Sequence, residues 1–412
     1  MKSDNNQTQA DDGLWFGKDM STPESIPEET IEQAVALMRT GRLHRYGEQG
    51  SGYPEPSLLE QEYAQYIGSK YCVAVSSCGA AMFLALKALG VEPGDKVLTS
   101  SFTLAPVPGA IAHAGAQPIL VETQPDYTTD LAHLEHLLQT SGSKVFLLSH
   151  MRGHITDLQA VRVLCDRYHV ALVEDCAHTM GAKWDGRHTG TWGRIGCYST
   201  QTYKHINSGE GGLLVTDDDD IAARVILMSG CYMMYEQHIL KPPNHVFERW
   251  KYLTPNFSMR MSNLAALLLR PQLALLAQRG HRWNSIYAEV ESRLREVPFL
   301  VIPARNSKEE FVASSLQFSL ALKSVQIERF LTECSRRGLY IKWFGGREPI
   351  AFTSNYDHWH YITEKPALTA SMQVMNQLLD LRTPLSLSSD DCDLISQIIT
   401  KAVEIAAAVA PT

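Results

Sequence analysis

The sequence lacks the features that would place it in a membrane or on a nucleic acid. Its longest apolar stretch, residues 264–277, is interrupted by Arg270-Pro271 and is too short to cross a bilayer. The chain has 37 Lys and Arg against 45 Asp and Glu, and the two signs are interspersed. It therefore offers no basic surface for nucleic acid or anionic lipid. The polar N-terminus has no apolar signal-peptide core, so we expect a cytoplasmic protein.

The chain also lacks the spacings of metal sites. None of its eight cysteines belongs to a CxxC pair, and Cys72 and Cys165 lie in apolar runs. Such residues are typical of small buried side chains in a reducing compartment, without disulfides. His150 and His154 are four residues apart, but no third ligand follows at a recognisable spacing. We therefore expect no metal site.

The regular feature of the sequence is an alternation of short apolar runs with helical segments. Because the runs are almost continuously apolar, they predict a mostly parallel sheet covered by helices on both faces, an α/β fold. The runs cover residues 71–75, 95–100, 117–122, 144–150, 169–175, 195–200 and 212–216. Ligands on such a sheet lie at the carboxyl ends of the strands.

The rest of the chain predicts three regions. Residues 1–20 are expected to be disordered, and residues 21–265 to form a large domain that includes a helix ending at Gly41. Residues 266–412 are expected to hold linker helices, divided at Arg270-Pro271, and a smaller α+β domain. Ser388-Ser389 predicts the start of the last helix.

The segment VALVEDCAHTMGA at residues 170–182 carries the first candidate site residues. An apolar strand ends at Asp175, and His178 follows within one helical turn. A carboxylate at this position could ligate a metal, cap a helix or bind a cationic ligand.

The segment IGCYSTQTYKHINSGEGGLLVT at residues 195–216 places Lys204 in a hydroxyl-rich loop between two apolar strands. Most lysines are solvated surface charges. Burial in such a loop would instead lower the pKa of the amine, as a Schiff-base lysine requires.

A third segment, residues 73–86, predicts a strand, a loop of small residues and a helix start. Ser76, Ser77 and Gly79 are candidates for an anion site there, and Ser199 could add a hydroxyl. The serines could also be plain helix caps. Pyridoxal phosphate (PLP) needs an amine, a carboxylate for its ring nitrogen and donors for its phosphate, and these segments supply all three.

These segments resemble the DegT/DnrJ/EryC1/StrS family of fold-type I PLP aminotransferases. The similarity extends from about Gly52 to Ala277 and is fainter beyond, with SHMRGHITDLQAV, GTWGRIGCYSTQTYK, GEGGLLVT and MRMSNLAA among the matching motifs. It implies that Lys204 holds PLP as a Schiff base and that Asp175 pairs with the ring nitrogen. It also implies that His178 lies beside the ring and that Ser199, Ser77, Cys78 and Gly79 surround the phosphate.

The sequence departs from the family pattern at several positions. Cys78-Gly79 stands where the family has Gly-Thr, which removes one hydroxyl donor, and Leu104 replaces the ring-stacking aromatic residue. The family's Asn-Tyr-Arg-Met, whose Asn reaches the phosphate of a neighbouring subunit, reads Ser258-Met259-Arg260-Met261 here, with Asn256 as a substitute. The segment WFGGREPIA replaces Tyr-x-Pro-Leu-His.

The resemblance implies an aminotransferase that moves an amino group from an amino-acid donor, glutamate or glutamine, to a keto acceptor. Arg260 and Arg347 could bind a substrate carboxylate, or could be surface charges or structural ion pairs. The acceptor would then be a sugar or a small carboxylated biosynthetic intermediate. The family also implies a homodimer with shared active sites.

Two other functions remain open. The same cofactor could serve elimination, cyclisation or racemisation without net amino transfer. A non-catalytic regulator could also have kept the fold, although the chain retains Lys204, Asp175 and His178 together.

Overall fold

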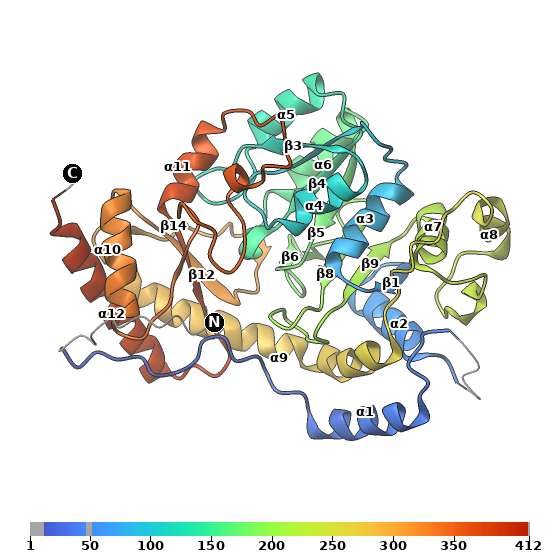
Figure 1. The fold of residues 1–412 in the computed structure, drawn as a ribbon, viewed down its shortest axis with the longest axis horizontal. Coiled ribbons are helices and arrows are strands. Elements are labelled where there is room, and N and C mark those ends of the chain that lie inside the picture. The colour runs from blue at the N-terminus through green and yellow to red at the C-terminus, as the bar shows by residue number, and fades with distance from the viewer. Residues whose placement is uncertain (1–11, 47–51, 411–412) are drawn as a thin grey trace.

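A seven-stranded sheet forms the centre of the larger domain in the computed structural model, which describes residues 12–46 and 52–410 (Figure 1). Its strand order is β1-β9-β8-β5-β4-β2-β3, and β9 runs antiparallel to both of its neighbours. The mostly parallel α/β fold is thus confirmed. The strands are β1 (Tyr71–Val75), β2 (Lys96–Ser100), β3 (Gln117–Val121), β4 (Val145–Ser149), β5 (Ala171–Asp175), β8 (Ile195–Ser199) and β9 (Gly212–Thr216).

Each predicted apolar run became one of these strands, and helices cover both faces of the sheet. One core packs the sheet against α3, α4 and α7, and two others pack its opposite face against α2 and α9 and against α5 and α6. The covering helices are α2 (Glu55–Ile67), α3 (Cys78–Ala88), α4 (Pro106–His113), α5 (Leu131–Thr140), α6 (Leu158–Arg167), α7 (Asp219–Ser229) and α8 (Asn244–Trp250). A small separate sheet pairs β6 (Lys183–Trp184) with β7 (Arg187–His188) and β11 (Glu309–Glu310).

The smaller domain is an antiparallel sheet in the order β10-β12-β14-β13, with helices on one face. Its strands are β10 (Leu300–Val301), β12 (Ser315–Leu320), β13 (Lys342–Trp343) and β14 (Leu378–Arg382), and its helices are α10 (Ser324–Ser335), α11 (Thr369–Gln377) and α12 (Ser389–Ala407). Leu379 and Leu381 of β14 lie in the core formed with α10 and α12. Because side chains alternate along a strand, Asp380 and Arg382 share the opposite, polar face. The domain limits at residues 265 and 266 stay predictions.

The helix α9 (Asn263–Leu294) joins the two domains and corrects the expected break at Arg270-Pro271. It is continuous over 32 residues with Pro271 inside it. Pro271 cannot donate the helical hydrogen bond to the carbonyl of Leu267, so the helix lacks one bond at this point. Leu269 and Leu276 are buried against the large domain, so packing holds the helix together through the proline.

The N-terminal segment also differs from the expectation. Residues 1–11 of the expected disordered region lie outside the described residues, but residues 12–20 pack on the small domain. Phe16 is 2% exposed, and its amide donates to the carbonyl of Arg337 at 2.8 Å. Lys18 pairs with Asp391 at 2.5 Å. Phe16 anchors the segment in the core of the small domain, and Leu14 and Met20 pack against the same core.

Several smaller predictions are confirmed. The first helix, α1 (Glu28–Thr40), ends at Gly41, whose φ of 68° is left-handed. Ser388 caps α12 in a capping box with Asp391. All eight cysteines are free and buried. Among the described residues, no helix combines the length and apolar character needed to span a bilayer.

Candidate active site

The carboxyl end of the parallel sheet brings together the three residues predicted to do chemistry. Asp175 is the last residue of β5, His178 follows it, and Lys204 lies in the loop between β8 and β9. The Lys204 Nζ is 2.8 Å from the His178 Nε2. The loop is closed by its own backbone, since the amide of Thr202 donates to the carbonyl of Gly209 at 3.1 Å.

Asp175 is buried, and donors on three sides fix its carboxylate. Its Oδ2 accepts the Ser149 hydroxyl at 2.7 Å, and its Oδ1 accepts the Ala177 amide at 3.1 Å. The Cys78 thiol reaches Oδ1 at 3.8 Å, and Thr103 donates to Ser149 at 2.7 Å. Sequence reasoning missed the roles of Ser149 and Thr103, although both lie at or just beyond strand carboxyl ends, where such a signal could have been found.

The protonation of Lys204 and His178 follows from burial and nearby cations. Burial, and then the charge of Arg152, lowers the pKa of Lys204 to about 8, although Asp175 opposes this shift. Burial and then the charge of Lys204 hold the pKa of His178 well below its usual value. His178 is therefore neutral at pH 7, and its Nε2 accepts a hydrogen bond from the amine of Lys204.

The start of α3, where an anion site is predicted, has donors without partners in the helix. Ser77 is the N-cap, and its hydroxyl oxygen accepts the Ala80 amide at 3.0 Å, which leaves its own proton free to donate. The amides of Cys78 and Gly79 have no acceptor within the helix. A Cβ on Gly212 would lie 2.4 Å from the carbonyl carbon of Ser77, so only glycine lets β9 support this turn.

Ser199 completes the predicted cofactor set at the end of β8, where it is 7% exposed. An amine, a carboxylate and a helix start with free donors thus lie along one edge of the sheet. These groups match the aldehyde, ring nitrogen and phosphate of PLP. The residues present therefore fit PLP.

Four other predicted residues have contacts that do not involve Lys204, Asp175 or His178. Leu104 is half-buried and packs against a group of buried apolar side chains that includes Phe102. Its contact with the cofactor ring stays a prediction. Asn256 and Ser258 are exposed, and the Asn256 side chain accepts the Ser258 amide at 2.9 Å. Arg260 donates to His44 at 3.2 Å and to the carbonyl of Gly230 at 3.3 Å.

Arg347 is on the small domain, and its predicted role in binding a substrate carboxylate stays a prediction. Arg347 is exposed and lines a groove with Lys323 and Val325 at the start of α10, and neither Lys204 nor Asp175 lines that groove. Two arginines that were not predicted from the sequence, Arg152 and Arg382, lie near enough to Lys204 for their charges to lower its pKa.

The predicted histidine pair has structural partners. His150 Nε2 lies 3.2 Å from Glu174 Oε2, and His154 Nε2 lies 2.9 Å from Gln317 Oε1. His150, Glu174 and Cys176 hold their ligand atoms within 4.8 Å of one another. Both oxygens of Glu174 already accept backbone amides, from Gly190 at 2.8 Å and Gly193 at 2.7 Å. Glu174, with His150 beside it, therefore fixes the turn between β7 and β8.

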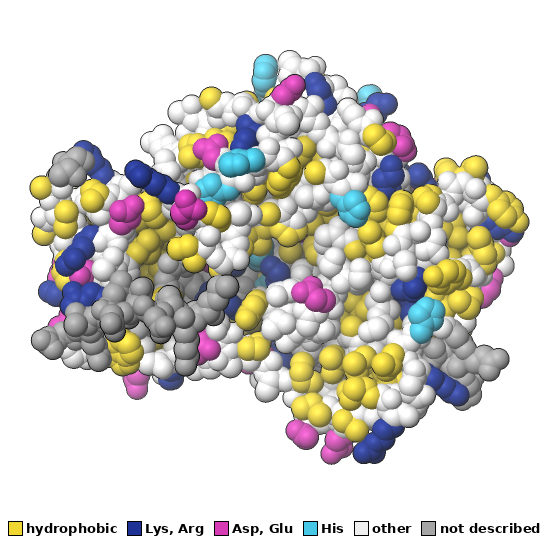
Figure 2. Space-filling view, in the orientation of Figure 1, with side chains coloured by type: hydrophobic (Ala, Val, Ile, Leu, Met, Phe, Trp, Pro, Cys, Tyr) yellow, Lys and Arg dark blue, Asp and Glu magenta, His cyan; other side chains and the backbone are white. Residues whose placement is uncertain are grey.

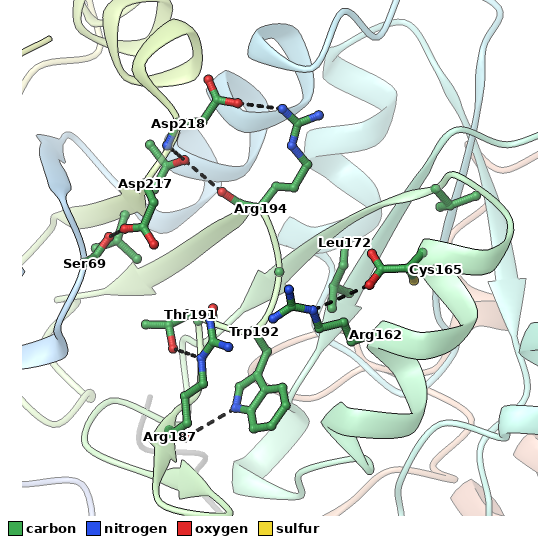
Figure 3. Close-up of a pocket in the computed structure, with 16 residues that line it drawn as sticks. Ser69, Arg162, Cys165, Leu172, Arg187, Thr191, Trp192, Arg194, Asp217 and Asp218 are labelled. Atoms are coloured by element: carbon green, nitrogen blue, oxygen red, sulfur yellow. Dashed lines mark hydrogen bonds and ion pairs between the residues drawn. The ribbon is translucent and has the colours of Figure 1, made fainter.

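A separate cavity of about 440 Å³ lies at the amino ends of the parallel strands (Figure 3). Leu172 at the start of β5 lines it, together with Arg194 just before β8. Arg194 pairs with Asp218 at 2.7 Å. The predicted cofactor residues are absent from its lining, so this cavity and the Lys204 site occupy opposite edges of the sheet.

Comparison with known proteins identifies similar chains. The DegT/DnrJ/EryC1/StrS aminotransferase family model matches residues 24–400. The spore coat polysaccharide biosynthesis protein SpsC of Bacillus subtilis (strain 168) is 29% identical over 285 residues, which are 68% of this chain and 71% of SpsC. The structure of 3-amino-5-hydroxybenzoic acid (AHBA) synthase has a TM-score of 0.80 at 21% identity, covering 95% of this chain and 100% of its own.

A further structural neighbour, Spr1654 of Streptococcus pneumoniae, has been solved in a PLP-form and a PMP-form. Both have a TM-score of 0.77 at 18% identity, cover 93% of this chain and are themselves covered to 98% and 99%. The family model spans most of the chain, and the Lys204 site has the groups that PLP requires. The chain belongs to the DegT/DnrJ/EryC1/StrS aminotransferase family and is a PLP-dependent aminotransferase.

Proposed function

We propose that this enzyme moves an amino group from an amino-acid donor, glutamate or glutamine, to a keto acceptor that is a sugar or a small carboxylated biosynthetic intermediate. The observation that carries the chemistry is the Lys204–His178 contact of 2.8 Å beside the buried Asp175. The acceptor classes rest on similar proteins, one named for polysaccharide biosynthesis and one for synthesis of an aminobenzoic acid.

PLP, when bound, supplies an electron sink for the carbanion of the amino acid. Lys204 would hold its aldehyde carbon, Asp175 its protonated ring nitrogen, and the amides at the start of α3 with Ser77 and Ser199 its phosphate. Because the pKa of Lys204 is lowered to about 8, much of its amine is neutral near that pH and can take a proton from the donor Cα. His178 accepts a hydrogen bond from Nζ and so orients this base.

The Lys204→Ala variant tests the assignment. We expect the purified variant to lose the yellow colour that PLP gives when it is bound through a lysine. Lys144→Ala, at an exposed position, is the matched control and should keep it. A Lys204→Ala protein with an unchanged visible spectrum would refute the assignment.

Amino transfer is separated from other PLP chemistry by a half-reaction. Incubation with L-glutamate or L-glutamine alone should convert the bound cofactor to pyridoxamine phosphate and release the matching oxo acid, which mass spectrometry can identify. Release of ammonia or a racemised amino acid, without pyridoxamine phosphate, would instead favour elimination or racemisation.

We further propose a homodimer. The apolar run at residues 264–277 is largely buried inside the chain, since Leu267, Leu269 and Leu276 are buried. Apolar side chains instead gather at the surface over α1 and over the region of α7 and α8 (Figure 2). They include Tyr252 and Leu253, which are 83% and 72% exposed.

The loop at residues 251–261, which carries Asn256, Ser258 and Arg260, would then reach the cofactor of the partner subunit. Sedimentation of the wild type should give twice the mass of the chain, and Leu253→Lys should shift the protein toward the monomer. A wild type that sediments as a monomer at micromolar concentration contradicts the dimer. A cytoplasmic location stays a prediction.

A further inference from the structure

The arginines near Lys204 outnumber the carboxylates that could neutralise them. Arg382 lies at the end of β14, and its guanidinium carbon is 4.5 Å from the ring centre of Tyr203, the residue before Lys204. Among the residues that the structure describes, no carboxylate lies within ion-pair distance of Arg382. A half-buried guanidinium with an aromatic contact and no acidic partner is typical of a site that binds an anion.

Arg152 reaches the same place from the large domain. Its side chain is 14% exposed and pairs with Asp380 at 2.9 Å, two residues before Arg382 on the same face of β14. Asp380 is shared, because its other oxygen accepts the Gln317 amide at 2.6 Å. Arg152 itself has a left-handed φ of 55°, and its Nε is buried without a partner. The single Asp380 therefore does not neutralise two arginines.

Lys342 adds a third cation to this face. It is the register partner of Asp380 on β13, and its Nζ lies 4.7 Å from the ring centre of Phe352. The Arg152 guanidinium carbon lies 5.2 Å from the centre of that ring. The Lys342 amine is already engaged by the backbone carbonyls of Ile350 and Phe352, at 2.5 and 3.2 Å. Arg382 is thus the cation of this group with the most free donors.

We propose that Arg382, with Arg152 beside it, binds a carboxylate of the amino-acid donor next to Lys204. The inference rests on the proposed function, because it names the residues that would hold the donor while Lys204 acts on its Cα. A planar guanidinium can hold a carboxylate through two parallel hydrogen bonds, which fixes the donor in orientation as well as position. This site is distinct from the groove that Arg347 lines, because Arg382 and Arg152 are absent from the lining of that groove.

The electrostatics of the neighbouring groups agree with this geometry. Burial is the main cause of the lowered pKa of Arg382, and the charge of Arg152 comes next. Both arginines also contribute to the lowered pKa of Lys204, after burial. A bound carboxylate would relieve this repulsion among cations. Asp19 is exposed, and the charge of Arg382 is the smallest of the causes that lower its pKa. Asp19 therefore does not neutralise Arg382.

The test is the equilibrium binding of glutarate, a dicarboxylate without an amino group, to the PLP-loaded enzyme by isothermal titration calorimetry. We expect Arg382→Gln to weaken glutarate binding at least tenfold. Arg382→Lys should weaken it about three- to tenfold, since an ammonium keeps the charge but not the fork. Arg329→Gln, an exposed arginine on α10 of the same domain, is the control and should stay within twofold. The visible spectrum of each variant reports that the cofactor is retained.

The outcomes separate the inference from the proposed function. Glutarate binding that is undetectable in the wild type, or unchanged in Arg382→Gln, overturns the carboxylate site even if L-glutamate still converts the cofactor. Binding that depends on Arg382 in an enzyme that no amino donor converts supports the site and refutes the transamination instead. Arg152→Gln should weaken glutarate binding less than Arg382→Gln, because Asp380 already pairs with Arg152.

Discussion

Two clusters of buried charge in this protein are balanced in opposite ways. In the first, Arg45 makes two bonds of 2.6 Å to the carboxylate of Glu60 on α2, and His238 lies 2.8 Å from the guanidinium and 3.0 Å from Glu60. In the second, Lys204 faces the neutral His178, and Arg152 and Arg382 add further positive charge.

The pKa shifts record the difference. Although burial alone would raise it, the attraction of Arg45 and His238 lowers the pKa of Glu60 to about 2. For Lys204, burial and the nearby arginines act in the same direction, and its pKa falls to about 8. A balanced cluster holds chain segments together, whereas an unbalanced cluster is completed by an anionic ligand.

Breaking the balanced cluster should have the largest effect on stability. Arg45→Met leaves the Glu60 carboxylate buried without its cation, so we expect a loss of about 3–5 kcal/mol of unfolding free energy. Urea unfolding of the PLP-loaded enzyme at pH 7 measures this loss. The double variant Arg45→Met/Glu60→Leu should recover most of it. An Arg45→Met protein as stable as the wild type would show that the cluster is not balanced in the way described.

Removing the charge of Lys204 from the other cluster should stabilise the folded protein, in contrast to the loss expected for Arg45→Met. In the cofactor-free protein, Lys204→Met removes a buried amine that nearby cations destabilise, so we expect the unfolding free energy to rise by roughly 1–3 kcal/mol at pH 7. Lys144→Met at an exposed position should change it by less than about 0.5 kcal/mol. Destabilisation by Lys204→Met would contradict the excess of positive charge.

The gain from Lys204→Met should also depend on pH. The pKa of Lys204 is lowered from 10.5 to about 8 in the folded protein, so the unfolded chain binds more protons between these values. Below about pH 8 both states are protonated and the wild type carries the full penalty. Its stability should then recover as the pH rises from 8 toward 10.5. Urea midpoints of both cofactor-free proteins at pH 7 to 10 should converge, and a constant difference would contradict the shift.

The sequence predicted the large sheet because its strands are buried on both faces and leave short apolar runs. It failed where distant packing decides the local structure. Pro271 reads as a helix break, but the large domain packs along α9 on both sides of it. The short apolar run at Phe16 does not show by itself that it is buried, because the surface that covers it comes from the C-terminal domain.

In the active site, too, residues with a local sequence signal were predicted, whereas a residue brought in from a distant segment was missed. Lys204, Asp175 and His178 follow directly from strand ends, where local sequence and the family pattern agree. Arg382 was missed because its strand belongs to the other domain, and only the fold brings it to Tyr203. Arg347 was chosen for its place in a motif, and its predicted contact with the substrate stays a prediction.

The smallest effect that we predict concerns Gly79, and it tests whether the start of α3 binds the anionic phosphate of PLP. Gly79 is in the first turn of α3, and a Cβ there would meet only the Ser77 hydroxyl, at 3.7 Å. Gly79→Thr would therefore fit and add a hydroxyl donor near the predicted phosphate position. We expect PLP to bind about two- to tenfold more tightly, the effect of one added hydrogen bond.

Gly79→Val is the matched control for this change, because valine has the shape of threonine without the hydroxyl. PLP affinity, measured by equilibrium dialysis, should rise in Gly79→Thr and stay near the wild-type value in Gly79→Val. Equal affinities in the two variants would place the phosphate away from the start of α3. A gain limited to threonine would instead show that the donors at this helix start are matched to a ligand anion, unlike those around Glu60, which are already engaged within the chain.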